Sequence, residues 1–322
     1  MAPVSSHVRG ETDTPLIEDT IGQVLDRAIA RWPEMEAVVS VEQSVRWTFA
    51  EFGRRIDRLA AGLIALGLKP GARVGIWAPN CVEWTLAQFA TARCGLIQVN
   101  VNPAYRLTEI EYTLNTAGVT ALICAESFKT SDYVAMVEAL APEVASSGRA
   151  SLAAKRAPSL RIVAKIGGAP RAGWLEFSEI SGDDVAQVRA IECTLENRQP
   201  INIQFTSGTT GLPKGATLSH RNIINNAFFV GRSAGLRTGD RLCIPVPLYH
   251  CFGMVMANLA CVLHGATMVY ASPGFDPLAV LRAVERERCT VLYGVPTMFI
   301  AELQHPEFES FDLSSLRAGI MA

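Results

Sequence analysis

The chain has 322 residues, of which 49% are apolar and 19% are charged, and its formal net charge is −2. This composition is typical of a folded protein with a substantial core, and it excludes a disordered or fibrous chain. The near-neutral charge offers no basic surface for nucleic acid, so we set that class of function aside. The length allows one large domain or two domains of ordinary size.

Cysteine usage and the N-terminal residues bear on the cellular compartment. None of the eight cysteines forms a Cys-x-x-Cys pair, and most lie inside apolar runs, which indicates buried, reduced thiols. Cys251 follows His250, but no second pair of ligands accompanies them, so we set a metal centre aside. Residues 1–20 include acidic residues and have no apolar core, which argues against a signal peptide. These features predict a cytoplasmic protein.

The most apolar long stretch is 254–270, which Asn258 and the pair His264-Gly265 interrupt. Such interruptions favour a buried helix followed by a strand over a membrane span. We therefore expect no transmembrane segment. The sequence leaves peripheral membrane contact and the oligomeric state open.

Strands and helices alternate along the first part of the chain. Apolar spacing predicts a helix over 20–31, followed by short strands over 37–41 and 45–47. Thr48 and Glu51 form a capping-box pattern that opens a helix ending at Gly67. Asn80 is expected to cap the helix after the next strand. The complete prediction for this part adds strands at 73–77, 96–101 and 121–124, and helices at 81–94, 108–116 and 131–140.

The second part of the chain repeats the alternation. Residues 142–160 have little periodicity and are expected to form an exposed connection, after which a strand at 161–166 and a polar, helix-prone stretch at 182–198 follow. Beyond a loop rich in Gly and Thr, Ser219 is expected to cap a helix over 220–234. The remaining prediction is of strands at 241–244, 267–271, 291–295 and 316–320, and of helices at 251–263, 277–287 and 296–303.

This alternation predicts an α/β fold with mostly parallel sheets and helices on their faces. We expect two wound layers, residues 1–198 and 199–322, with the Gly- and Thr-rich loop at their junction. The turn after the first strand of the alternation lacks Gly-x-Gly-x-x-Gly, so a dinucleotide-binding fold has no support. Ligands of such sheets tend to lie beyond the carboxyl ends of the strands.

The loop after residue 205 has the composition of a triphosphate site. The apolar run 201–205 looks like a buried strand, and it is followed by Thr206-Ser207-Gly208-Thr209-Thr210-Gly211-Leu212-Pro213-Lys214. Glycine allows main-chain N–H groups to converge on an anion, the hydroxyl groups add donors, and Lys214 adds a positive charge. A Walker A loop needs Gly-Lys-[Ser/Thr], whereas Lys214 follows a proline here, so a P-loop NTPase is disfavoured.

The segment from Thr206 to Lys214, with its continuation to His220, resembles the phosphate-binding signature of AMP-forming acyl-CoA synthetases and related adenylating enzymes. Every position of that signature matches, and the resemblance runs from about residue 21 to residue 322. The segments around His250 and at 316–322 are most similar to the branch that acts on medium- to long-chain fatty acids. The chain therefore resembles an incomplete N-terminal adenylation domain of a fatty-acyl-CoA synthetase.

The resemblance implies that ATP, Mg²⁺ and coenzyme A take part. The carboxylate would attack the α-phosphorus of ATP, and the acyl group would then pass to the coenzyme A thiol. Neither step needs a protein nucleophile, so catalysis would depend on positioning and charge neutralisation. Lys214 would neutralise the departing pyrophosphate, and Thr209 would lie nearest the magnesium. The implied phosphate-binding residues are Thr206, Ser207, Gly208, Thr209, Thr210, Gly211 and Lys214.

The segment from Pro245 to Gly253, Pro-Val-Pro-Leu-Tyr-His-Cys-Phe-Gly, resembles a second signature of the same enzymes. The resemblance implies that His250 lies between the nucleotide and acyl sites and helps to position the carboxylate. With Lys214 and Thr209, His250 completes the candidate catalytic set. The implied acyl pocket includes His250, Phe252, Gly294 and Gly319, although ordinary core packing is the alternative for each residue.

Members of this family continue with an adenine-side Tyr-Gly-x-Thr-Glu segment, a ribose-binding Asp, a hinge and a small C-terminal lid domain, and none of these appears before Ala322. We therefore expect a truncated synthetase that is inactive alone. Two other functions stay open: a non-catalytic nucleotide-binding remnant of a disrupted gene, and an adenylating enzyme that loads a carrier-protein thiol. The expected partners are a small carboxylic acid and a nucleotide.

Overall fold

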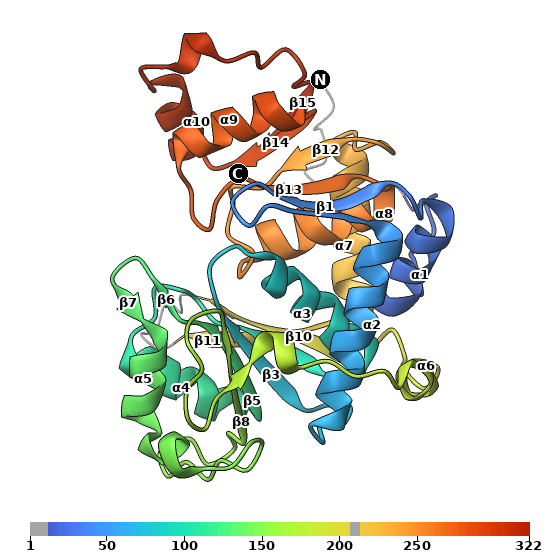
Figure 1. Cartoon of the computed structure of the whole chain (residues 1–322). Coiled ribbons are helices and arrows are strands. Elements are labelled where there is room, and N and C mark those ends of the chain that lie inside the picture. Colours follow the sequence, from blue (N-terminus) through green and yellow to red (C-terminus); the bar gives the residue numbers. More distant parts are fainter. Residues whose placement is uncertain (1–11, 207–212) are drawn as a thin grey trace, which may run out of the picture.

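Two sheets form the frame of the molecule (Figure 1), and the computed structural model describes residues 12–206 and 213–322. The six-stranded sheet has the order β15 (Ala318–Met321), β14 (Val291–Gly294), β12 (Arg241–Cys243), β13 (Thr267–Tyr270), β1 (Glu36–Ser40) and β2 (Val45–Thr48). The seven-stranded sheet has the order β11 (Lys214–Ser219), β10 (Pro200–Thr206), β4 (Ile97–Asn100), β3 (Arg73–Trp77), β5 (Ala121–Ala125), β8 (Ile162–Ile166) and β9 (Leu175–Glu176). Strands β6 (Ser127–Phe128) and β7 (Ser131–Asp132) form a separate ribbon.

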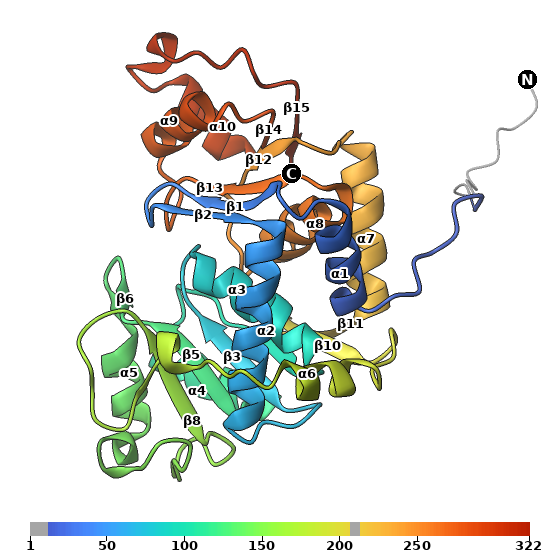
Figure 2. The same cartoon turned by 45° about the vertical axis from the view of Figure 1, so that its right-hand side comes forward.

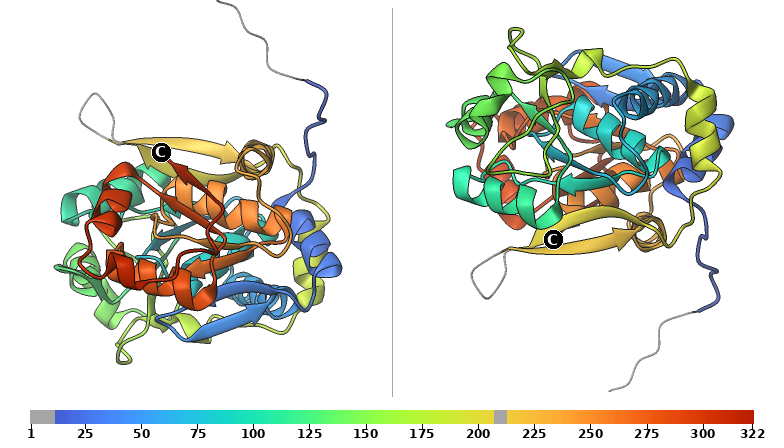
Figure 3. Two further views of the ribbon diagram at one scale, coloured as in Figure 1. Left: turned by 90° about the horizontal axis from the view of Figure 1, so that it is seen from above. Right: turned by 90° about the horizontal axis from the view of Figure 1, so that it is seen from below.

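The predicted fold class is confirmed. Within the two large sheets of the described residues, β1–β2 and β10–β11 are the antiparallel pairs, and every other pair is parallel. Parallel strands need crossover connections, and helices supply most of them here. Figure 3 shows the β10–β11 hairpin along one side of the molecule, where β11 is the edge strand of its sheet.

Helices occupy three layers around the sheets (Figures 1 and 2). A middle layer lies between the two sheets: α1 (Ile21–Arg31), α2 (Phe49–Ala65), α3 (Val82–Arg93), α7 (His220–Ser233), the π-helix η3 (Phe252–Leu259) and α8 (Ala260–His264). One outer layer, α9 (Pro277–Glu287) and α10 (Pro296–Leu303), covers the six-stranded sheet. The other, α4 (Leu107–Ala117) and α5 (Tyr133–Leu140), covers the seven-stranded sheet. Helix α6 (Val185–Glu192) packs on α2, and short 3₁₀ turns lie at Pro142–Ser146, Phe177–Glu179 and Phe308–Ser310.

The alternation of side chains along each strand divides the core into three clusters. On β1, Val38 lies in the central cluster between the sheets, whereas Val39 lies in the cluster under α9. On β5, Ile123 lies in the central cluster and Leu122 in the cluster under α4 and α5. Both faces of central strands such as β1 and β5 are therefore buried, which explains why these strands read as nearly continuous apolar runs.

The expected division of the chain at residues 198 and 199 does not coincide with the division between the sheets. Strands β1 and β2, from the first part of the chain, pair with strands of the second part through β13. Strands β10 and β11, from the second part, extend the first-part sheet through β4. Strand pairing depends on contacts between residues far apart in the chain, which the periodicity of each segment does not reveal.

The helix starts show where local patterns were sufficient. Thr48 accepts a hydrogen bond from Glu51 N at 3.2 Å and caps α2 as predicted, but the Glu51 carboxylate turns to Arg55 at 2.7 Å. The prediction that Asn80 caps α3 is wrong: the cap residue is Cys81, and the side chain of Asn80 bonds elsewhere. Ser219 caps α7 as predicted, with a reciprocal contact to Asn222.

Two segments differ from the expected local structure. The connection 142–160 is not simply exposed, because it buries five apolar side chains in the cluster under α5, namely Val144, Leu152, Ala154, Ala157 and Leu160. The apolar stretch 254–270 divides into helix and strand as predicted, but its first part is the π-helix η3. Among the residues with described structure, no helix combines the length and apolarity needed to cross a bilayer.

Candidate active site

The β10–β11 hairpin places the two ends of the Gly- and Thr-rich loop opposite each other. Thr206 pairs with Lys214 across the ladder, and its hydroxyl donates to the Lys214 carbonyl oxygen at 3.4 Å. The Tyr112 hydroxyl on α4 donates to the Pro213 carbonyl oxygen at 3.2 Å. Both Thr206 and Lys214 are exposed, so each is available to a ligand. Strand β11 was not predicted, because its residues have no clear alternation.

The remaining phosphate-loop predictions, Ser207, Gly208, Thr209, Thr210 and Gly211, lie outside the described residues. Their roles, including that of Thr209 toward Mg²⁺, stay predictions. Within the described ranges, no group of three or more His, Cys, Asp or Glu side chains could hold a metal ion.

A cavity of about 730 Å³ lies beside the hairpin. Thr206 and His250, which were predicted from separate motifs, both line it. The other lining residues come from the loop after β4, the hairpin, α7 and the segment around His250: Asn102, Gln204, Phe205, Ala216, Leu218, Asn222, Ile223, Asn226, Tyr249, Cys251 and Val255. The structure therefore brings the end of β10 and the candidate histidine to one cavity, here called the hairpin cavity.

His250 has a defined protonation pattern. Its Nδ1 atom accepts a hydrogen bond from Phe252 N at 3.2 Å, and Cys251 Sγ lies 3.6 Å away. Partial burial lowers the pKa of His250 from its ordinary value, so the ring is neutral at pH 7. In a neutral ring whose Nδ1 accepts, the proton is on Nε2. His250 can therefore donate a hydrogen bond from Nε2, whereas Nδ1 is not free to act as a base.

A second cavity of about 730 Å³ adjoins the first along α7. Asn222 and Asn226, one helical turn apart, line both cavities. The second cavity is mostly apolar, and it is lined by Gly319 of β15, whose role in an acyl pocket stays a prediction; its other lining residues are Leu16, Asn225, Phe229, Val230, Ser233, Ala234, Met256 and Ile320. A β-carbon at residue 319 would lie 2.4 Å from the Leu292 carbonyl oxygen, so this position requires glycine. We call this space the α7–β15 cavity.

The structure does not bring the other two predicted pocket residues to these cavities. Phe252 is buried, with 6% of its surface exposed, and its ring stacks on Tyr293 at 5.6 Å. Gly294 ends β14, where a β-carbon would lie 2.9 Å from the Phe299 ring. Both positions are accounted for by packing, and a substrate role for either stays a prediction.

Several polar residues of the cavities were missed from the sequence, among them Gln204, Asn222 and Asn226. Gln204 interrupts the apolar run of β10 and lines the hairpin cavity. Asn222 and Asn226 are exposed on α7 at a spacing of four, which places them on one helix face. The spacing of four predicts that Asn222 and Asn226 share a helix face, but the sequence does not show that this face lines a cavity.

The chain is similar to known proteins over nearly its whole length. Residues 25–322 match the family described as AMP-binding enzyme. The chain is 44% identical over 324 residues to the mitochondrial medium-chain acyl-CoA ligase ACSF2 of Danio rerio, covering 99% of this chain and 53% of that protein. It is 43% identical over 311 residues to the Bacillus subtilis protein that carries the name acyl-CoA synthetase YngI, and the match covers 95% of this chain and 56% of that protein. The chain thus spans about half the length of the curated relatives it matches.

Solved structures show the same fold. The anthranilate CoA ligase AuaEII, in complex with anthranoyl-AMP, superposes with a TM-score of 0.80 and 25% identity over 96% of this chain and 56% of that chain. The N-terminal domain of FACL13 from Mycobacterium tuberculosis superposes with a TM-score of 0.75 and 24% identity over 94% and 69%. Together with the match over residues 25–322, these likenesses lead to one conclusion: the chain belongs to the AMP-binding enzyme family.

Proposed function

We propose that this chain forms the phosphate- and acyl-binding part of an AMP-forming ligase, which activates a medium- to long-chain fatty acid with ATP and transfers it to coenzyme A. The observation that carries the proposal is the pair of adjoining cavities. Thr206 and His250 line one, Gly319 lines the other, and Asn222 with Asn226 lines both. A nucleotide phosphate and an apolar acyl chain would meet where the two cavities adjoin.

In this proposal the chain positions reactants and balances charge. A carboxylate oxygen of the fatty acid attacks the α-phosphorus of ATP, and the bond to the bridging oxygen breaks, which releases pyrophosphate. His250 Nε2–H donates to the carboxylate and fixes its orientation, and Lys214 offsets the charge of the departing pyrophosphate. A thiol then attacks the acyl carbonyl carbon and AMP leaves. Mg²⁺, held near Thr209, would supply further positive charge at the phosphates.

The choice of a fatty acid rests on the apolar lining of the α7–β15 cavity, with Phe229, Val230 and Met256. A medium-chain acid is the first candidate, because relatives with over 40% identity carry the name medium-chain acyl-CoA ligase. The cytoplasmic location stays a prediction, since the same relatives are named mitochondrial.

The test is acid-dependent exchange of labelled pyrophosphate into ATP, measured on the complete reading frame that contains these residues. A panel of acids from acetate to stearate should support exchange only for the medium and long chains. Adding coenzyme A should then give acyl-CoA and AMP. Exchange that is completed by a carrier protein but not by coenzyme A would favour the carrier-loading alternative. No exchange with any acid would favour a non-catalytic nucleotide-binding remnant.

A further inference from the structure

The segment 244–250 carries His250, and two of its amides have main-chain partners: Ile244 N donates to the Val269 carbonyl oxygen at 2.9 Å and His250 N to the Pro247 carbonyl oxygen at 3.2 Å. Strand β12 ends at Cys243, and the segment that follows contains Pro245 and Pro247. Proline has no N–H, so the strand ladder does not continue beyond Ile244. Its remaining main-chain groups need partners from elsewhere, because unpaired polar groups are costly when buried.

Asn80, which follows β3, supplies one set of partners. Its Nδ2 donates to the Val246 carbonyl oxygen at 2.9 Å, and its Oδ1 accepts from Leu248 N at 2.8 Å. Only 6% of the Asn80 surface is exposed. One carboxamide thus satisfies both a donor and an acceptor of the segment, in the manner of a strand neighbour.

Asn100, the last residue of β4, supplies the second set. Its Nδ2 donates to the Tyr249 carbonyl oxygen at 2.9 Å, directly before His250. Its Oδ1 accepts from Asn202 Nδ2 on β10 and from Gln98 Nε2, both at 2.9 Å. Asn100 is 2% exposed, and Asn202 is fully buried.

These hydrogen bonds connect two parts of the wall of the hairpin cavity: strand β10 and the segment that carries His250. Strand β10 carries Asn202 near its start and ends at Thr206, where the phosphate loop begins. A single buried side chain, Asn100, joins that strand to the residue before His250. Buried hydrogen bonds of this kind are strong and geometrically restrictive, because no water competes for the partners.

The start of η3 is fixed against the same segment. A β-carbon at Gly253 would lie 2.4 Å from the Pro247 carbonyl oxygen, so the helix approaches the segment as closely as glycine allows. Gln88 Nε2 donates at 3.0 Å to the Met254 carbonyl oxygen within the π-helix. His250 therefore lies between two restrained elements, and the two asparagines restrain the one that precedes it.

We propose that Asn80 and Asn100 form an amide clamp that positions His250 relative to the phosphate strand β10 during carboxylate activation. The side chains of Asn80 and Asn100 bond to main-chain groups and to other amide side chains, not to His250 or to a substrate, so both are positioning residues. This inference rests on the proposed function for its catalytic consequence, whereas its structural consequence is independent of turnover.

The test compares Asn100→Ala with wild type in the complete reading frame. The variant removes the bond to the Tyr249 carbonyl oxygen and the acceptor shared by Asn202 and Gln98, without adding a buried charge. Pyrophosphate exchange should show a kcat that is lower by about 10- to 100-fold, because small displacements of a positioning group have effects of that size. The KM for ATP should change little, since the phosphate loop itself is untouched. Hydrogen exchange at the amides of Leu248 and Met254 should accelerate, while that of Leu122 on β5 should not.

Thr85→Val is the matched control. Thr85 is fully buried and its hydroxyl bonds to Tyr270 at 2.8 Å, but it makes no contact with segment 244–250 among the described hydrogen bonds. This variant should be less stable than wild type, but its kcat should be unchanged, and hydrogen exchange at the Leu248 amide should not accelerate locally. If Asn100→Ala does not fold, Asn80→Ala tests the other arm of the clamp with the same readouts.

If Asn100→Ala or Asn80→Ala kept the wild-type kcat, and the amides of Leu248 and Met254 exchanged hydrogen at the wild-type rate, the inference would be overturned. A uniform acceleration of exchange over the whole molecule would also overturn it, because that result indicates loss of global stability rather than of positioning. A wild-type protein without acid-dependent pyrophosphate exchange would instead overturn the proposed function alone. The hydrogen-exchange measurement would still decide whether the clamp holds the segment.

Discussion

At the scale of single residues, Lys214 gives the sharpest test of the phosphate site. Lys214→Ala should lower kcat/KM for pyrophosphate exchange by about 100-fold or more, because a preorganised charge on a phosphate contributes that much to transition-state stabilisation. The folded structure should be unaffected, since Lys214 is exposed at the start of β11. Exchange kinetics and a thermal unfolding curve measure the two effects separately. Lys155→Ala removes another exposed lysine, within 142–160, and should change neither; near-normal exchange in Lys214→Ala would refute the phosphate-site assignment.

How far residues could be predicted from the sequence follows from the range of their interactions. His250 and Thr206 could be chosen as candidates because each lies in a contiguous motif, and the structure brings both to one cavity. Asn100 was not found, because its partners Tyr249 and Asn202 are more than a hundred residues away in the chain. Asn80 was assigned to a local cap when its side chain serves a distant segment. Side chains that act locally are readable from the sequence, and those that bridge the fold are not.

At the scale of elements, the contact between α1 and α7 makes stability depend on pH. His220, the first residue of α7, is 1% exposed, and its Nδ1 accepts from Ile21 N at the start of α1, at 3.1 Å. Burial lowers its pKa from 6.5 to about 4. Between these values the unfolded chain binds a proton that the folded chain does not. The free energy of unfolding should therefore be highest above pH 6.5 and fall by roughly 3 kcal/mol as the pH drops toward 4.

Urea unfolding of wild type and His220→Asn across this pH range measures that contribution. The asparagine oxygen can still accept from Ile21 N, but it does not titrate. The variant should lose the part of the pH dependence that His220 supplies, whereas the contributions of His250 and His264, whose pKa values burial also lowers, should remain. Identical pH profiles for the two proteins would show that His220 is not the titrating group.

Elements were predicted better than their arrangement. Helices α2, α7 and α9 follow the apolar period of their own sequence, so they were found with small errors at the ends. Membership of a sheet depends instead on which strands lie next to each other. That is why β1 and β2, from the first part of the chain, lie in the same sheet as β12 and β13. The π-helix η3 is a further example: a β-carbon at its Gly253 would lie 2.4 Å from the Pro247 carbonyl oxygen, which lies outside the helix.

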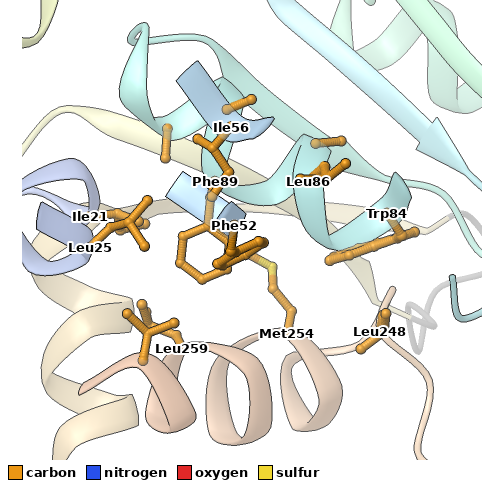
Figure 4. Close-up of a cluster of buried hydrophobic side chains, with 14 of the residues drawn as sticks. Ile21, Leu25, Phe52, Ile56, Trp84, Leu86, Phe89, Leu248, Met254 and Leu259 are labelled. Carbon is orange, nitrogen blue, oxygen red and sulfur yellow. The ribbon is translucent and has the colours of Figure 1, made fainter. Parts of the chain in front are cut away.

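At the scale of the whole molecule, the middle helix layer is shared by both sheets. Figure 4 shows side chains from α1, α2, α3 and η3 meeting in the central cluster: Ile21, Leu25, Phe52, Ile56, Trp84, Phe89, Met254 and Leu259. The same cluster includes Val38 of the six-stranded sheet and Ile76 of the seven-stranded sheet. A core of this kind joins the two sheets into one cooperative unit, because unfolding of either sheet would expose the buried inner face of the other sheet to water.

Phe52→Ala tests this cooperativity. Phe52 is fully buried and packs edge-to-face on Phe89 with ring centres 5.3 Å apart, so its removal should lower the free energy of unfolding by about 3–5 kcal/mol. Because the cluster is shared, hydrogen exchange should accelerate together in β13 and in β5, on opposite sides of the layer. Val137→Ala removes a fully buried side chain from the outer cluster under α5 and should cost less, since fewer carbons are lost. Protection that persists in one sheet while the other opens in Phe52→Ala would mean that the sheets unfold separately, contrary to a single shared core.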